Sequence, residues 1–101
     1  MTGQLQQGSI IKVEKVKHPV LVVSKDFFNS SGEIIGCPII ENSQEGPLHI
    51  FISTEEVRGY VQCEKMALLD VTVRGYKKLD EISMPVLMDI SDAIQSIFEY
   101  I

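Results

Sequence analysis

Two histidines and a short polar run are the features of this chain best suited to acid–base chemistry. His18 stands directly before Pro19, and Ser43 lies in a polar loop between Glu41 and Glu45. An imidazole can give or take a proton near neutral pH, and paired carboxylates can divide the roles of acid and base. For His18, the pattern leaves open both a catalytic role and that of an ordinary hairpin residue. For Glu41 and Glu45, the first interpretation is that they belong to a solvated surface loop and are not catalytic.

Metal-ligating and thiol chemistry find less support. Cys37 and Cys63 lie in apolar, strand-like segments, which predicts buried free thiols in a reducing compartment. A disulfide requires the two segments to be neighbours, and the sequence leaves that open. Because no two of the cysteines and histidines are closely spaced, the chain lacks a zinc pattern. We expect neither a metal nor another cofactor.

Basic residues gather in two groups on a chain whose net charge is −5. Residues 1–28 carry four lysines against Glu14 and Asp26, and a second group follows position 73. If the fold brings the groups together, they could form a groove for RNA phosphates. Equally, they could be the charged faces of edge strands, which discourage pairing with other chains. The candidate RNA-binding residues are Lys15, Lys17, Arg74, Lys77 and Lys78.

Short strands and one terminal helix must position these groups. Alternating or continuous apolar residues predict strands at 9–16, 19–24, 33–40, 48–52, 60–63 and 76–82. We expect a hairpin at 15–18, a bulge or sheet edge at Pro38 and a helical turn at 53–56, and 66–69 is ambiguous. Apolar residues at helical spacing from Val86 to Phe98 predict an amphipathic helix capped by Ser83. The fold class is therefore mainly β with a C-terminal α-helix, built as a small curled sheet.

Length and composition predict one domain. The chain has 101 residues, of which 45% are hydrophobic and 23% charged, as in ordinary globular proteins. Residues 1–7 form a polar, flexible lead-in, and 8–101 form a single domain. No apolar run approaches the roughly 20 residues that span a bilayer. The N-terminus lacks the pattern of a signal peptide, so we expect a cytoplasmic protein with no membrane partner.

An ordered series of short motifs resembles the MazF/PemK (Kid-like) family of toxins from bacterial type II toxin–antitoxin systems. The series runs Gly8-Ser9-Ile10-Ile11, Pro19 to Ser24, Cys37-Pro38-Ile39, Gly59-Tyr60-Val61 and Val73 to Lys78, followed by the helix. The resemblance covers residues 8–100. It implies a small SH3-like barrel, shared with the toxin CcdB, a homodimer and a cognate antitoxin partner. It also implies a metal-independent endoribonuclease that cleaves single-stranded RNA, such as mRNA, by attack of the ribose 2′-hydroxyl.

The resemblance also identifies where this chain departs from the family. His18 stands where the family has its catalytic Arg, and Ile40 where it has a Thr or Ser. A histidine can supply acid, base or positive charge, but Ile40 has no hydrogen-bonding group. Among the nearby polar residues that could compensate, we name Ser43 with His18 as the catalytic candidates; the others are Lys17, Glu41 and Asn42.

Two alternatives to a ribonuclease follow from these departures. One is a catalytically impaired homologue that acts through protein binding, above all to an antitoxin. The other is inhibition of DNA gyrase, as in CcdB, whose essential residues are C-terminal; here the chain ends Phe98-Glu99-Tyr100-Ile101.

Overall fold

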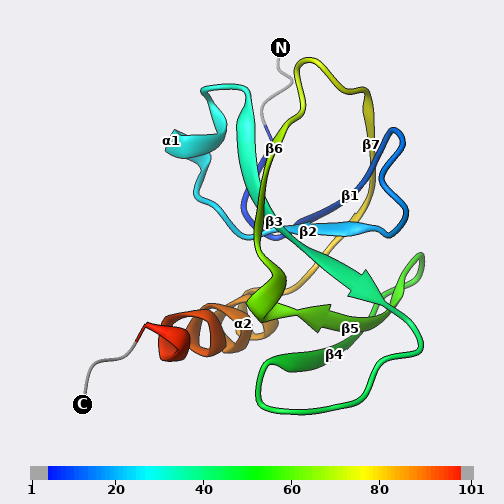
Figure 1. The fold of residues 1–101 in the computed structure, drawn as a ribbon, viewed down its shortest axis with the longest axis vertical. Coiled ribbons are helices and arrows are strands. Elements are labelled where there is room, and N and C mark those ends of the chain that lie inside the picture. The colour runs from blue at the N-terminus through cyan, green and yellow to red at the C-terminus, as the bar shows by residue number, and fades with distance from the viewer. Residues whose placement is uncertain (1–4, 99–101) are drawn as a thin grey trace.

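The computed structural model describes residues 5–98, and β3 (Glu33–Ile40) is the strand around which its sheet is organised (Figure 1). On one side β3 pairs with β2 (Val20–Val22), and on the other with β6 (Ala67–Asp70) and then β5 (Arg58–Gln62). β4 (His49–Ser53) extends the sheet beyond β5. β1 (Ser9–Val13) and β7 (Tyr76–Glu81) continue it beyond β2. The seven strands are all antiparallel and form a curled, barrel-like sheet, as predicted.

The curl divides the interior into two apolar clusters. The first lies under α2 (Met84–Ile97), whose Ile90 is fully buried against Leu21, Cys37 and Val61. The second lies on the other side of β1 and β2 and holds Ile34. All three residues of β2 are buried, which confirms the predicted central strand. Burial of strand faces and of one helix stripe thus holds the small domain together.

Pro38 lies inside the sheet, so the edge position, one of the two alternatives predicted for it, is wrong. It is paired with Val20 of β2. On the opposite side, β6 pairs with β3 as far as Gly36 and β5 begins at Ile39. Pro38 therefore falls at the change of partner, where the missing N–H interrupts no continuous ladder.

One local expectation is wrong, and two other segments were ambiguous or not predicted. Ser53 ends β4 and residues 54–57 form the turn to β5, where a helical turn was expected at 53–56; of the ambiguous 66–69 segment, residues 67–69 lie in β6. A short helix that we did not predict, α1 (Asp26–Asn29), precedes the turn at Gly32, whose φ is +94°. Ser83 is the N-cap residue of α2 as predicted, although its side chain makes no capping bond. A 3₁₀ turn, η1 (Cys63–Lys65), links β5 to β6.

The ends of the described chain contact the barrel in different ways. Leu5 is buried, and the backbone N–H of Gln7 donates to Asp26 at 3.0 Å. At the other end Ile97 and Phe98 are exposed, although the sequence placed them on the apolar face of the helix. Within residues 5–98, no helix is long and apolar enough to cross a membrane. The C-terminal Glu99-Tyr100-Ile101 lies outside the described residues.

Candidate active site

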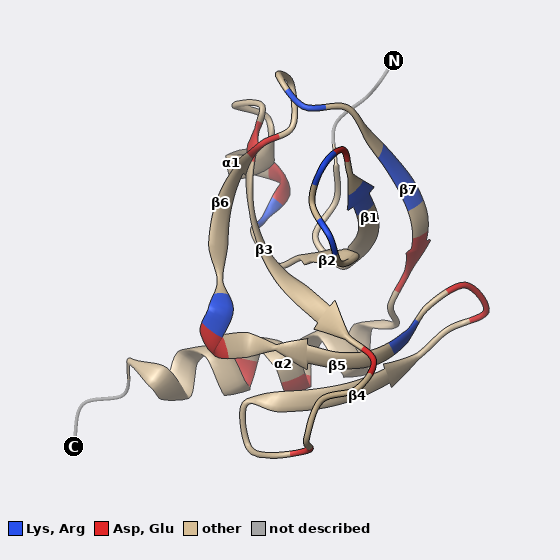
Figure 2. Ribbon diagram, turned by 45° about the vertical axis from the view of Figure 1, so that its right-hand side comes forward, with Lys and Arg blue, Asp and Glu red and all other residues tan. Residues whose placement is uncertain are grey.

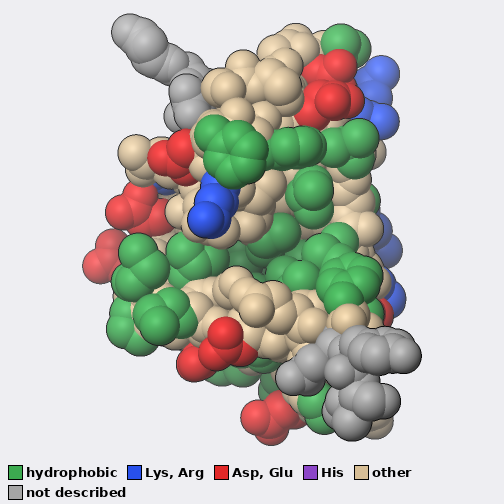
Figure 3. Space-filling model, turned by 90° about the vertical axis from the view of Figure 1, so that its left-hand side faces the viewer, with side chains coloured by type: hydrophobic (Ala, Val, Ile, Leu, Met, Phe, Trp, Pro, Cys, Tyr) green, Lys and Arg blue, Asp and Glu red, His purple; other side chains and the backbone are tan. Residues whose placement is uncertain are grey.

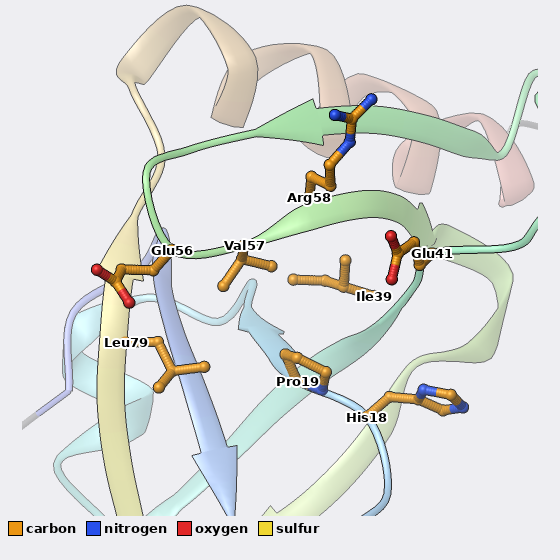
Figure 4. Close-up of a pocket in the computed structure, with 8 residues that line it drawn as sticks. All are labelled: His18, Pro19, Ile39, Glu41, Glu56, Val57, Arg58 and Leu79. Atoms are coloured by element: carbon orange, nitrogen blue, oxygen red, sulfur yellow. The ribbon is translucent and has the colours of Figure 1, made fainter.

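A pocket of about 420 Å³ opens beside His18. Its apolar middle consists of Pro19, Ile39, Val57 and Leu79, which come from four separate parts of the sheet (Figure 4). Four polar side chains stand around this middle. They are one imidazole, two carboxylates and one guanidinium: His18, Glu41, Glu56 and Arg58.

The turn between β4 and β5 fixes one wall of the pocket. The N–H of Thr54 donates to the carbonyl of Val57 at 2.7 Å, and the N–H of Val57 donates back to the Thr54 hydroxyl at 3.0 Å. Asp80 of β7 then holds this turn against the barrel. Hydrogen bonds from the Thr54 hydroxyl and from the backbone N–H groups of Glu81 and Glu56 lower the pKa of the Asp80 carboxyl. Arg58 follows this turn directly, so these hydrogen bonds also fix the position of its backbone.

The sheet register brings the two departure positions together. Val20 is paired with Pro38, and the N–H of Ile39 donates to the carbonyl of Pro19 at 2.9 Å. Each departure position lies one residue beyond this hydrogen-bonded pair, since His18 precedes Pro19 and Ile40 follows Ile39. The structure thus brings near each other the positions that the resemblance aligned with the family's Arg and Thr. Glu41 follows Ile40 and reaches the same pocket as His18.

Ser43 occupies a different place. Its hydroxyl accepts a hydrogen bond from the side-chain amide of Gln62 at 3.0 Å, and Gln62 is almost fully buried. Ser43 does not line the pocket beside His18. The hydroxyl thus anchors the loop after β3 to β5, and a catalytic role for Ser43 stays a prediction.

The two basic groups meet across β1 and β7 (Figure 2). Lys12 is paired with Lys77, and both line a groove of about 570 Å³ together with Lys15. Lys15 takes a positive φ of 68° in the turn that follows β1. Leu79 lines both this groove and the pocket beside His18, so the two hollows adjoin.

The remaining candidate cations lie around this groove. Lys78 forms an ion pair with Glu81 at 2.8 Å. Arg74 and Lys17 are exposed in the turns at the ends of β7 and β1, and neither lines the groove. The structure therefore joins Lys15 and Lys77 but leaves Arg74, Lys17 and Lys78 at the margin. Their contact with RNA remains a prediction.

Elsewhere, the surface histidine and both thiols have structural partners. His49 bridges the carbonyl of Gln44 and the carboxylate of Glu64, which raises the pKa of the imidazole. Cys37 and Cys63 are buried and free, as expected, and burial raises their pKa values to about 12 and about 11. In the described part of the chain, no group of three His, Cys, Asp or Glu side chains is placed to hold a metal ion.

Sequence reasoning missed Arg58 and Glu56 as site residues. Arg58 lies more than ten positions beyond the polar loop, in what the sequence presented as the approach to a strand. Only the pairing of β5 with β3 brings it near His18. A lone arginine beside a Glu-Glu turn carries no spacing signal, so no motif could have identified it.

Solved structures with the same fold are toxins. A MazE–MazF complex from Deinococcus radiodurans aligns with a TM-score of 0.87 at 21% identity, covering 96% of this chain and 98% of that one. An endoribonuclease from a mycobacterial species aligns at 0.83 and 16% identity, covering 97% and 94%. The Mycobacterium tuberculosis toxin MazF-mt6 aligns at 0.74 and 14% identity, covering 90% and 95%. No curated protein sequence matches this chain significantly.

Sequence likeness extends beyond the fold. Residues 4–98 match the family described as PemK-like, MazF-like toxins of type II toxin–antitoxin systems. The match spans nearly the whole chain, in agreement with the ordered motifs and the barrel topology. The chain therefore belongs to the PemK/MazF-like family of type II toxin–antitoxin toxins.

Proposed function

We propose that this protein is a metal-independent endoribonuclease toxin that cleaves single-stranded RNA in the bacterial cytoplasm. One observation carries the proposal: the pocket beside His18 combines an imidazole, carboxylates and a guanidinium. Cleavage by the ribose 2′-hydroxyl needs a base, an acid and positive charge for the developing phosphorane. The pocket contains all three, although the family's Arg and Thr positions hold His18 and Ile40.

In the proposed reaction each group has one role. The Glu41 carboxylate takes the proton of the 2′-hydroxyl as that oxygen bonds to phosphorus. Protonated His18 gives its proton to the 5′-oxygen as the phosphorus–oxygen bond breaks. The products are a 2′,3′-cyclic phosphate and a free 5′-hydroxyl. Arg58 stabilises the charge on the phosphoryl oxygens, a role for which its planar guanidinium is well suited.

The basic groove provides a path for the RNA chain. Lys12, Lys15 and Lys77 line it, and it adjoins the pocket at Leu79. Phosphates on one side of the cleaved bond would lie there. Local positive charge on β1 and β7 thus compensates for a chain that is acidic overall.

We further propose a homodimer and an antitoxin partner. One face of the molecule shows a broad band of hydrophobic side chains (Figure 3). On the same side, an apolar groove of about 200 Å³ runs between β3 and α2, lined by Met66, Ile90 and Ile94 among others. Phe27 and Leu68 are exposed. Contiguous exposed apolar surface of this kind favours protein contacts. MazF of Deinococcus radiodurans has been solved with MazE, which supports the same kind of partner here.

The test is cleavage of a long single-stranded RNA in EDTA, with the fragment ends mapped. Wild type should give discrete cuts with 2′,3′-cyclic phosphate ends. His18→Ala should abolish them, whereas His49→Ala, the same change at the other histidine, should cut normally. A folded wild type that leaves the RNA intact, or equal cutting by His18→Ala, would contradict the proposed mechanism.

A second candidate function rests on Ile40. An aliphatic side chain at the inherited hydroxyl position favours a homologue that retains antitoxin binding without cleavage. Intact RNA together with tight antitoxin binding would select this candidate.

A further inference from the structure

Two aromatic rings and a guanidinium lie together on the outer side of the β4–β5 hairpin. The rings of Phe51 and Tyr60 have centroids 5.2 Å apart and are tilted by 59°. The Arg58 guanidinium carbon lies 5.5 Å from the centroid of the Phe51 ring, which is 42% exposed. Because β4 is the last strand on its side of the sheet, this cluster stands at an open edge.

The cluster belongs to a row that leads to the candidate active site. Ile40 is paired with Tyr60, and Tyr60 is paired with Phe51. Direct cross-strand partners point to the same face of a sheet. The row therefore runs from Ile40 at the end of β3 across β5 to β4. Arg58 connects it to the pocket, because this side chain both lines the pocket and contacts Phe51.

We propose that Phe51, Tyr60 and Arg58 form a stacking platform for one unpaired nucleobase of the RNA, next to the cleaved phosphate. This inference rests on the proposed ribonuclease function and assigns it a base-binding subsite. A phenyl ring, a phenol ring and a guanidinium all offer flat faces on which bases stack. The apolar Ile40 side chain, as the cross-strand neighbour of Tyr60, extends the same face of the sheet.

Local charge indicates stacking rather than phosphate contact as the source of affinity. Glu41 and Glu56 line the pocket beside the platform, and Glu55 precedes Glu56 in the β4–β5 turn. Carboxylates repel the RNA backbone, whereas stacking does not depend on phosphate charge. The platform should therefore hold its base at high salt, while the basic groove on the other side of the pocket loses phosphate affinity.

The experiment is a binding titration with a random-sequence pool of short single-stranded RNA carrying 2′-O-methyl groups, which cannot be cleaved. Phe51→Leu keeps an apolar side chain but removes the ring. It should weaken binding about fivefold to a hundredfold, the range of one base–aromatic stack. Arg58→Ala should also weaken it. Phe51→Tyr, which restores a ring, should bind like wild type.

Controls separate stacking from folding and from general charge. Lys25→Ala changes an exposed lysine next to α1, which Figure 1 places far from β4 and β5. This variant should bind like wild type. An abasic ribose-phosphate pool should bind wild type and Phe51→Leu equally.

The outcomes distinguish the two proposals. If wild type binds the 2′-O-methyl pool and a folded Phe51→Leu binds it equally well, the platform is wrong while the ribonuclease proposal stands. If Phe51→Leu bound the abasic pool more weakly than wild type does, base stacking would not explain the role of Phe51, and the platform proposal would be wrong. If wild type binds no RNA at all, both proposals fail.

Discussion

The Nε2 atom of His49 lies 2.8 Å from a carboxylate oxygen of Glu64, and its Nδ1 atom lies 2.9 Å from the carbonyl oxygen of Gln44. Both partners are hydrogen-bond acceptors. A neutral imidazole can donate from only one nitrogen, whereas the imidazolium donates from both. The pair therefore raises the pKa of His49 and lowers that of Glu64, and it ties the loop after β3 to η1.

This arrangement predicts a pH window for stability. The raised pKa of His49 stabilises the fold fully below its unfolded value of about 6.5 and loses that effect as the pH rises through the folded value. The lowered pKa of Glu64 stabilises the fold above about 4.3 and loses its effect as the pH falls. His49→Gln should thus lower the urea midpoint most between these limits. If the loss in urea midpoint caused by His49→Gln stayed the same from about pH 5 to about pH 9, the ion pair would not be the source of the stability.

Asp80 braces the wall of the active-site pocket, and its removal should loosen that wall. Because hydrogen bonds lower its pKa, its contribution is present above about pH 3.9 and disappears as the pH falls through the folded value. Asp80→Asn should lower the melting temperature at neutral pH, and the difference should shrink in acid. Asp92→Asn, an exposed carboxylate on α2, is the matched control and should melt like wild type. If Asp80→Asn and Asp92→Asn lowered the melting temperature equally, Asp80 would not stabilise this turn more than any surface carboxylate does.

How far the sequence could predict this molecule depended on how local the signal was. The apolar run at Val20–Val22 and the helical spacing of α2 are local patterns, and both elements form where expected. Residues 53–56 predict a helix start because Ser, Thr and Glu also suit a helix N-terminus, but the chain turns there from β4 into β5. The conformation of this turn depends on the pairing of β4 with β5, which is a tertiary contact.

The same limit applies to the candidate site. His18 could be named because it precedes an aliphatic strand in a family-like order. Arg58 and Glu56 could not, because only the pairing of β3 with β5 and the brace from Asp80 bring them to the pocket. Ser43 lies near Ile40 in sequence, which makes it a candidate, but its hydroxyl accepts a hydrogen bond from the Gln62 side chain outside the pocket.

The two thiols should be inert in the folded protein. Burial is the largest cause of the raised pKa values of Cys37 and Cys63, about 12 and about 11. At pH 8 almost none of either thiol would be thiolate, which is the reactive form. A colorimetric disulfide reagent should therefore react only as fast as the protein opens, and quickly in denaturant. Rapid reaction of the native protein would show that one cysteine reaches solvent.

Restoring the missing hydroxyl should raise activity. Ile40 ends β3 between the pocket residues Ile39 and Glu41, and a threonine there keeps the β-branched shape that suits the strand while adding one donor. A single transition-state donor is worth about a hundredfold or more when removed from an evolved site, so Ile40→Thr should speed cleavage by about tenfold or more. Ile40→Val, which trims the side chain without adding a hydroxyl, is the control. Equal rates for the two variants would mean that the chemistry no longer uses this position.

The division of roles between the pocket carboxylates can be tested directly. Glu41 follows Ile40 at the end of β3, whereas Glu56 comes from the turn on another side of the pocket. If Glu41 is the base, Glu41→Gln should lower kcat by about a hundredfold to ten-thousandfold. Glu56→Gln should lower kcat less than about tenfold, because it changes only the local field. The reverse result would assign the proton transfer to Glu56, and a small loss in both variants would place the base outside this pair.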